Sequence, residues 1–377
     1  MNDTTSLLQQ LVAIDSVNPD LVPNGAGEKE IAIFISNWLE QAGLTVEWDE
    51  PQPGRPSVVG IAHGTGGGRS LMLNAHMDTV GVSGMERPHQ PFIEGNRLYG
   101  RGAFDMKGGL AAAMIATARA RQAGLRGDVI LTAVADEEYA SLGTQSVLKR
   151  WTADAAIVTE PTDLQLCLAH KGFIWQEVIT QGRAAHGSRA DLGLDAIAKM
   201  GHVLVGLERL HNELQRGPAH PLLGHGSLHA SIIRGGQEWS SYPEQCVLQL
   251  ERRTIPGETI NDVETQLQTL LNSLRQADPA FQATARTILV RDAFEVAEDA
   301  PIVQVLRHHA GLLLENEPPL IGATPWMDSA LLAAAGISTV VFGPGGAGAH
   351  AVVEWADLQQ VEQCADILFA TIQEFCR

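Results

Sequence analysis

The chain has 377 residues, of which 45% are hydrophobic and 19% charged, and its 44 acidic and 26 basic side chains give a formal net charge of −18. This composition is typical of a globular protein with about two or three domains and excludes a disordered chain. The acidic excess and an aromatic content of 5% argue against nucleic-acid binding and against docking on anionic membranes.

Apolar strands alternate with helices in both terminal parts of the chain. The predicted helices are Leu7–Val12, Ile31–Ala42, Met106–Ala123, Pro301–Leu314, Asp328–Ala335 and Ala356–Phe375. The predicted strands are Ser57–Ala62, Ser70–Asn74, Val129–Val134, Ala155–Val158 and Ser338–Phe342. This alternation predicts an α/β fold with a mixed, largely parallel sheet flanked by helices. Gly64–Gly68 joins two strands and leads into no helix, so we predict a hairpin turn there.

The middle of the chain has a different order of elements, β-α-β-β-α-β, which is the ferredoxin-like split motif. The predicted elements are Phe173–Gln181, Leu194–Gln215, Leu228–Arg234, Gln245–Arg253, Glu258–Gln276 and Phe281–Val290. We therefore predict an inserted α+β lid domain at residues 173–291. It would divide a catalytic domain made of residues 1–172 and 292–377.

Cysteine usage and the N-terminal segment indicate the compartment. The four cysteines show no CxxC or zinc-finger spacing. The first residues lack the basic and apolar regions of a secretory signal, and no apolar run approaches the ~20 residues of a membrane span. We therefore expect a cytoplasmic protein without a disulfide framework.

Five polar segments carry the chemistry, and each lies where a predicted strand ends or a helix begins. Their candidate residues are His76 with Asp78, then Asp105, Asp136–Glu138, Glu160 and His350. Singly, each has an ordinary explanation, such as a helix cap for Asp105 or a solvated acidic turn for Asp136–Glu138.

Together, these residues form a set of two imidazoles and three carboxylates at the edge where open α/β sheets place their sites. Such a set suits a borderline cation such as zinc. Two dications would balance the three carboxylates and one bridging hydroxide. Glu137, next to Glu138, is then a candidate general base for the metal-bridging water.

The motifs as a set resemble those of the di-zinc amidohydrolase and exopeptidase family that contains acetylornithine deacetylase, succinyl-diaminopimelate desuccinylase, aminoacylase and glutamate carboxypeptidase. They are Asn74–Val80, Gly100–Gly109, Asp136–Glu138, Thr159–Pro161 and Gly343–His350. The resemblance covers essentially the whole chain. It implies a di-zinc catalytic domain with a ferredoxin-like lid, and cobalt and manganese are alternatives to zinc.

The family pattern also implies a role for each residue. Asp105 would bridge the two metals, with Glu138 and His350 on one of them and His76 and Glu160 on the other. Asp78 would support His76, and Glu137 would handle the proton. The peptide bond after Asp105 is a candidate for the cis form.

The lid adds candidates for substrate binding. His186 resembles a family histidine that reaches an active site, commonly that of the partner subunit, and would donate to the oxyanion; the alternative is a surface histidine. Arg253 resembles the arginine that binds a substrate carboxylate, with Arg252 as its rival by alternation. Asp328 would cap the helix that follows it, line the pocket or do both. Gly345 is a further candidate for substrate binding. The segment Glu238–Pro243 lacks an asparagine that several relatives carry.

We therefore expect a metal-dependent hydrolase of N-acyl amino acids, similar to acetylornithine deacetylase and dimeric through the lid. One alternative is a di- or exopeptidase of the glutamate carboxypeptidase type that acts on small peptides. The alternative from another class is an inactive metal-binding regulatory protein, against which the intact Glu137 argues. Neither nucleic acid nor a membrane is an expected partner.

Overall fold

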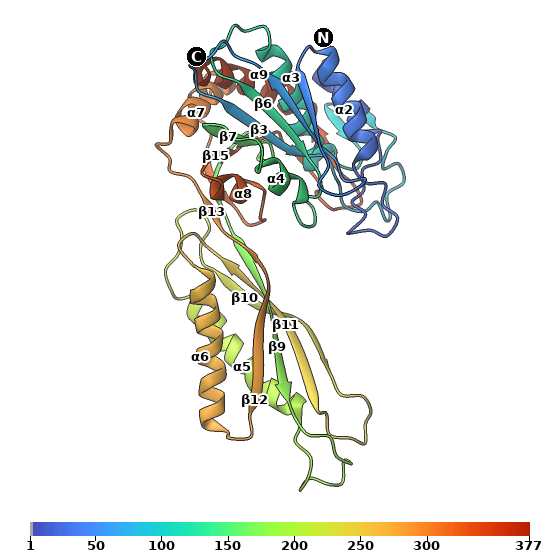
Figure 1. Ribbon diagram of the computed structural model, residues 1–377, viewed down its shortest axis with the longest axis vertical. Helices are drawn as coiled ribbons and strands as arrows, with labels where there is room; N and C mark the ends of the chain where they lie inside the picture. The colour runs from blue at the N-terminus through green and yellow to red at the C-terminus, as the bar shows by residue number, and fades with distance from the viewer. Residues whose placement is uncertain (1–2) are drawn as a thin grey trace. The chain divides into compact units, whose positions relative to one another are not determined.

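The structure is a computed structural model that describes residues 3–377, so the first two residues of the N-terminal segment lie outside it. The chain forms two compact units. The first contains the residues up to Leu168 together with Val296–Ile321 and Met327–Arg377, and the second contains Ala169–Glu295 and Gly322–Trp326. The second unit is therefore inserted into the first along the sequence, and both are drawn in Figure 1.

A nine-stranded sheet, most of whose strands belong to the first unit, forms the centre of that unit. Its order is β1-β2-β6-β3-β7-β15-β8-β13, with β14 paired to β8. The strands are β1 Thr45–Asp49, β2 Ser57–Ala62, β3 Leu71–His76, β6 Val129–Val134, β7 Ala155–Val158, β8 Leu166–His170, β13 Phe294–Glu295, β14 Leu320–Ala323 and β15 Ser338–Val341. Strand β3 is parallel to both β6 and β7, and β15 is parallel to β7, whereas β2 is antiparallel to β1 and β6. The predicted mixed α/β sheet is confirmed.

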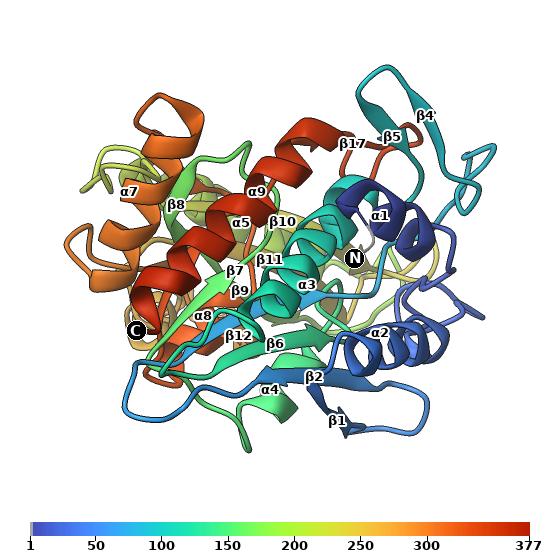
Figure 2. The same ribbon diagram turned by 90° about the horizontal axis from the view of Figure 1, so that it is seen from above.

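Helices cover both faces of this sheet, which explains why its central strands are buried along their whole length. The helices are α1 Thr4–Val12, α2 Lys29–Gln41, α3 Gly108–Ala120, α4 Leu142–Val147, α7 Pro301–Leu314, α8 Ser329–Ala334 and α9 Leu358–Phe375. Helices α3 and α9 lie together on one face, while α4 and α8 lie on the other (Figures 1 and 2). Helix α3 is built of small residues, and this allows it to pack closely against the strands.

The predicted hairpin at Gly64–Gly68 is wrong, because β6 lies between β2 and β3 in the sheet. The segment instead crosses the turn that precedes β6. The Gly64 amide donates to Asp128 Oδ1 at 2.8 Å, and the Gly66 amide donates to the Arg126 carbonyl at 2.8 Å. A Cβ at Gly68 would lie 2.4 Å from the Gly127 nitrogen, so this close crossing requires glycine.

A small sheet joins two distant segments of the first unit. Its order is β16-β17-β5-β4, and its strands are β4 Phe92–Glu94, β5 Arg97–Tyr99, β16 Gly346–Ala347 and β17 Trp355–Asp357. It places the chain just before Asp105 beside the loop that carries His350.

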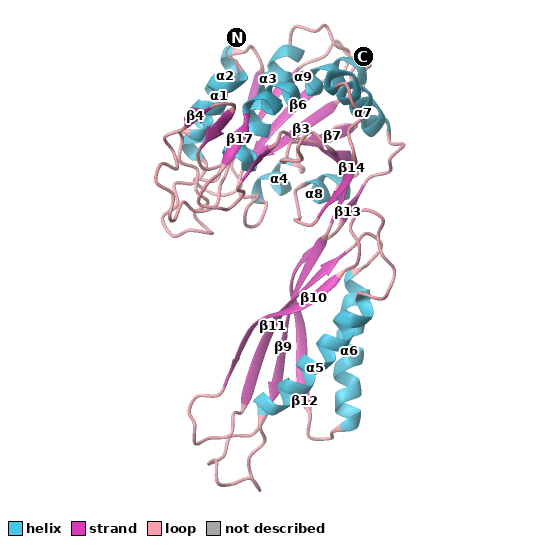
Figure 3. Cartoon of the chain, turned by 180° about the vertical axis from the view of Figure 1, so that it is seen from behind, coloured by secondary structure: helices cyan, strands magenta, loops and turns pink. Residues whose placement is uncertain are grey.

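The second unit has a four-stranded antiparallel sheet of order β10-β11-β9-β12 and two helices, with the βαββαβ element order of the ferredoxin-like motif (Figure 3). Its elements are β9 Gly172–Gln181, α5 Ala196–Leu214, β10 Ser227–Gly235, β11 Gln245–Thr254, α6 Ile260–Ala277 and β12 Gln282–Arg291. Met200, Val203 and Leu271 of the helices are buried with Val178 and Leu248 of the sheet. Across residues 3–377, none of the helices combines the length and the apolar character needed to cross a bilayer.

Candidate metal centre

His76 ends β3 and points into the centre of a polar cluster. The side chain is buried, and its Nε2 lies 3.2 Å from Asp105 Oδ1 and 3.6 Å from Glu160 Oε1. On the other side of the ring, Nδ1 lies 2.9 Å from the main-chain oxygen of Asp78. A neutral ring that donates from Nδ1 to this oxygen presents Nε2 to the cluster as a lone pair, which is the form that binds metals.

The Asp78 carboxylate has further partners besides His76. Its Oδ1 lies 3.7 Å from His76 Nδ1, whereas its two oxygens accept the backbone amides of Glu137 at 3.1 Å and Glu138 at 3.2 Å. Asn18 Nδ2 donates to the same carboxylate at 2.8 Å. The carboxylate of Asp78 therefore fixes the segment that carries the two glutamates, and its carbonyl orients the histidine.

Asp105 lies between the two histidines. Its Oδ1 faces His76, and its Oδ2 lies 3.4 Å from His350 Nε2. The residue belongs to the turn Ala103–Lys107, where Asp105 and Met106 have non-helical dihedral angles, and the Asp105 side chain does not cap the turn. The helix-cap explanation is therefore wrong, and the Asp105–Met106 bond is cis, as the resemblance implied.

The remaining acids complete two overlapping groups. Ligand atoms of His76, Glu137 and Glu160 lie within 4.8 Å of one another, as do those of His76, Asp105 and Glu138. His350 Nε2 lies 3.0 Å from Glu138 Oε2, so this histidine adds to the second group. The structure thus brings together every residue that the sequence proposed as a metal ligand, and it places Glu137 among them.

Burial and mutual repulsion disfavour the ionised form of the glutamates in this cluster. Burial and the nearby Glu160 raise the pKa of Glu137 well above its usual value, and burial also raises the pKa of Glu138 and Glu160. Hydrogen bonds to Asp105 and Glu138 raise the pKa of His350 to about 10. These glutamates therefore hold their protons more tightly than isolated carboxyl groups do.

The donor set fits divalent cations. It consists of imidazole nitrogens and carboxylate oxygens, which are the ligands of zinc and of related metals. Glu138 Oε1 is buried and has no hydrogen-bond partner among the residues the structure describes. A buried carboxylate oxygen without a donor is costly unless a cation satisfies it.

A buried ion network behind Asp78 was not found from the sequence. Asn18 Nδ2 also donates to Asp136 Oδ1 at 3.0 Å, and Arg55 Nη2 lies 2.7 Å from the same oxygen. Arg55 Nε in turn pairs with the buried Glu28 at 2.7 Å. Asn18, Glu28 and Arg55 form no motif, so only the fold reveals that they hold Asp136 and Asp78 in place.

Asp328 and Gly345 both lie in the first unit and are buried. Asp328 does not cap α8: its backbone is helical, and its Oδ2 instead accepts from Thr144 Oγ1 at 2.5 Å. A Cβ at Gly345 would lie 2.1 Å from Asp163 Oδ1, so a larger residue here would displace the side chains of Asp163 and Gln360.

His186 and Arg253 belong to the second unit. His186 is exposed, and its Nδ1 lies 2.8 Å from Ser188 Oγ. Arg253 is partly exposed, lies over the Phe173 ring and pairs with Glu251 at 2.7 Å. Its rival Arg252 is 1% exposed and paired with Glu258, so it supports the interior of this unit.

Comparisons with known proteins find relatives of this chain. The profile of "Peptidase family M20/M25/M40" matches residues 72–374. An acetylornithine deacetylase of Myxococcus xanthus is 29% identical, with 100% of this chain and 99% of the relative aligned. The N-formyl-4-amino-5-aminomethyl-2-methylpyrimidine deformylase of Bacillus subtilis is also 29% identical, over 94% of this chain and 91% of the relative.

Solved structures share the fold along the whole chain. Aminopeptidase PepT from Bacillus cereus superposes with a TM-score of 0.81 at 17% identity, covering 99% of this chain and 98% of its own. An M20 family metallo-carboxypeptidase from Sulfolobus solfataricus gives a TM-score of 0.77 at 18% identity, covering 100% and 99%.

Proposed function

The chain belongs to peptidase family M20/M25/M40 and is a metal-dependent amidohydrolase or peptidase, and we propose that it removes the acyl group from N-acyl amino acids. The observation that carries the proposal is the buried cluster. In it, ligand atoms of Glu137, His76 and Glu160 lie close enough together to hold one metal ion. The full-length similarity to an acetylornithine deacetylase supports a deacylase of that kind.

Two zinc ions would be held at this cluster, with cobalt and manganese as alternatives. His76 and Glu160 would bind one ion, Glu138 and His350 the other, and Asp105, which faces both histidines, would bind both. When bound, such ions activate water and polarise the scissile carbonyl.

Glu137 would be the proton carrier of the reaction. A carboxylate oxygen of Glu137 lies close to ligand atoms of His76 and Glu160, and its backbone amide donates a hydrogen bond to Asp78. As general base it would take the proton of the attacking water at a carboxylate oxygen and then deliver it to the leaving amine.

The second unit would supply the substrate contacts. Arg253 would hold the free carboxylate of the amino-acid part, and its partly exposed guanidinium leaves donors accessible for that task. His186 would donate to the oxyanion of the tetrahedral intermediate, which its exposed ring permits. Asp328 would contribute its buried charge to the wall of the site.

A second copy of this chain is the partner we propose for the inserted unit. Strand β10 is an edge strand of its sheet, and its Ile232 and Ile233 side chains are exposed. An exposed apolar edge strand favours pairing with another strand. Light scattering on the native chain should give the mass of a dimer, and an Ile233→Lys variant should shift it towards the monomer; a monomeric native chain would contradict this part.

A panel of substrates tests the proposed reaction. We expect the zinc-loaded protein to hydrolyse N-acetylornithine and related N-acyl amino acids with a higher kcat/KM than dipeptides. The N-formyl aminomethylpyrimidine named for the Bacillus subtilis relative is the third kind of substrate in the panel. Faster turnover of dipeptides would replace the deacylase by an exopeptidase, and turnover confined to the formyl compound would replace it by a deformylase.

A further inference from the structure

Glu354 lies where the two loops of the metal centre meet. It directly precedes β17, whose residues Trp355 and Ala356 pair with Tyr99 and Leu98 of β5. The chain continues from β5 through Gly100 and Arg101 to Asp105, so this pairing brings Glu354 to the segment that carries the central carboxylate. His350 lies four residues before Glu354 on the same loop.

The Glu354 carboxylate accepts four hydrogen bonds from that segment. Its Oε1 accepts the backbone amides of Phe104 at 3.0 Å and Asp105 at 3.1 Å. Its Oε2 accepts the Gly102 amide at 3.0 Å and Arg101 Nη1 at 2.6 Å. A carboxylate has about four lone-pair sites, so the hydrogen-bonding capacity of Glu354 is filled.

Geometry explains why this turn needs an acceptor from elsewhere. Asp105 and Met106 depart from helical dihedral angles, and no side chain within the turn caps it. The amides at the start of a helix have no intrahelical acceptors, and buried ones must be satisfied. Glu354, which is 1% exposed, satisfies three of these amides from a segment about 250 residues further along the chain.

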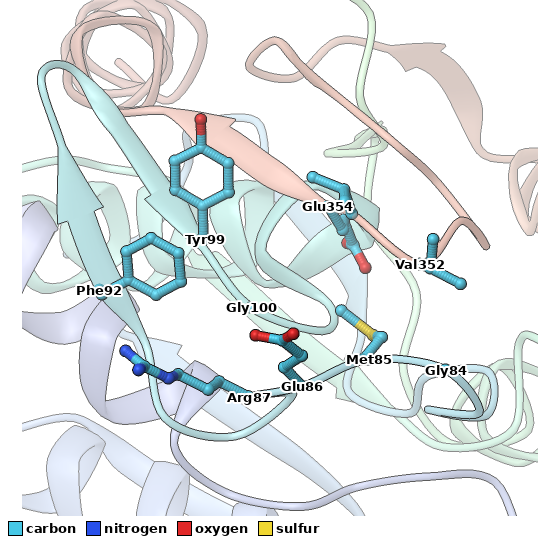
Figure 4. Close-up of a pocket in the computed structure, with 10 residues that line it drawn as sticks. Gly84, Met85, Glu86, Arg87, Phe92, Tyr99, Gly100, Val352 and Glu354 are labelled. Carbon is cyan, nitrogen blue, oxygen red and sulfur yellow. The ribbon is translucent and has the colours of Figure 1, made fainter.

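Arg101 extends the connection to the histidine loop. The residue is 3% exposed, and while Nη1 pairs with Glu354, its Nη2 donates to the Ala351 carbonyl at 2.9 Å. Ala351 follows His350 directly. A pocket of about 480 Å³ lies outside this junction, and its lining includes Gly100, Val352 and Glu354 (Figure 4).

We propose that Glu354, together with Arg101, is a positioning residue that sets the distance between Asp105 and His350 and thereby tunes metal affinity. The proposal rests on the metal centre of the proposed function. Neither residue binds the metal. Glu354 orients the backbone that presents Asp105, and Arg101 holds the loop that presents His350. Groups that support metal ligands in this way typically contribute about 10–100-fold to metal affinity.

The test compares Glu354→Gln with the native chain by zinc titration against a competing chelator. Gln keeps the size of Glu, but its amide nitrogen cannot accept, so about two of the four donors lose their acceptor. We expect zinc affinity to fall about 10–100-fold, and saturating zinc to restore most of kcat, because the ligands themselves remain. The matched control is Glu258→Gln, which also removes charge opposite a buried arginine but lies in the second unit; its zinc affinity should equal that of the native chain.

Unchanged zinc affinity in a folded Glu354→Gln protein would overturn the proposal, even if its melting temperature fell, because that result indicates support of the fold alone. If this variant does not fold, Arg101→Met serves instead, since it leaves the three backbone amides on Glu354 and removes the link to Ala351. It should lower zinc affinity less than Glu354→Gln, and unchanged affinity would again overturn the proposal. Failure of the native chain itself to bind zinc would instead contradict the metal centre.

Discussion

Most candidate residues of the first unit are buried or half-buried, with His350 as the exposed exception, whereas those of the second unit lie at its surface. In the first unit, His76, Asp78 and Glu160 are buried and contact other ionisable groups at short distances. In the second unit, His186 is exposed and Arg253 partly exposed, and each contacts residues close in sequence or on the adjacent strand. Burying several carboxylates together costs folding free energy unless a cation compensates. This difference supports the proposal that the first unit would bind the metal and the second would contact substrate.

Among the substitutions, Glu137→Gln should lower activity most. It tests the role of the cluster in the first unit. Loss of a general base lowers kcat by about 10²–10⁴-fold, while both metal ions should remain bound. Activity assays and metal analysis of the same sample measure the two quantities. A variant that loses one ion would instead identify Glu137 as a ligand, as its group with His76 and Glu160 also permits.

His186→Ala should have the next largest effect on activity. It tests the role of the second unit. Removal of one donor to an oxyanion typically lowers kcat by about 10²–10³-fold. Because the residue lies in the second unit, metal content and affinity should not change. The exposed His229 provides a control on the same unit, and His229→Ala should retain native kcat. Equal activity of the two variants would remove His186 from the mechanism.

Arg253→Ala should raise KM for N-acyl amino acids with little change in kcat. A charge-assisted hydrogen bond is worth about 1.5–3 kcal/mol, so a rise of about 10–100-fold is expected. A substrate amide without the free carboxylate should be insensitive to the change. Arg252→Ala is the contrasting variant: it breaks a buried pair with Glu258 and should lower the melting temperature. The assignment fails if Arg253→Ala affects both kinds of substrate equally.

Asp328→Asn should have the smallest effect and should act on stability. Burial raises the pKa of Asp328 to about 6 from 3.8. The folded chain therefore binds this proton more tightly than the unfolded chain, and stability is lost as the pH rises through about 6. The Asn variant should unfold at a higher temperature than the native chain at pH 7.5 and show a smaller difference near pH 4. No pH dependence of that difference would contradict the assignment of a buried charge.

The metal ligands could be predicted because each one lies in a short motif next to a strand or helix end. His76 ends β3, and Glu138 and Glu160 come shortly after β6 and β7; parallel strands bring such ends to one edge of the sheet. Spacing of apolar residues likewise predicted most helices and strands. The sequence did not predict that β6 lies between β2 and β3 in the sheet, because this order depends on long-range strand pairing.

The supporting residues could not be predicted for a related reason. Asn18, Arg55 and Glu354 each contact segments far away in the sequence, and a lone polar residue has no periodicity or spacing to mark it. The chemistry of this site is therefore visible in local motifs, whereas the geometry that makes it work depends on the fold. Arg252 and Arg253 illustrate the same limit. The alternation of side chains along the strand left both as candidates for binding the substrate carboxylate, and only the structure shows that Arg252 is buried.

Titration of the metal-free protein with zinc, followed through N-acetylornithine hydrolysis, tests the central claim most directly. Chelation should abolish hydrolysis, and activity should return and reach a plateau near about two zinc ions per chain, as expected for a two-metal hydrolase. The same titration of Glu137→Gln should show the same binding without hydrolysis. Hydrolysis that survives complete removal of metal, or a native chain that binds no zinc, would contradict the account.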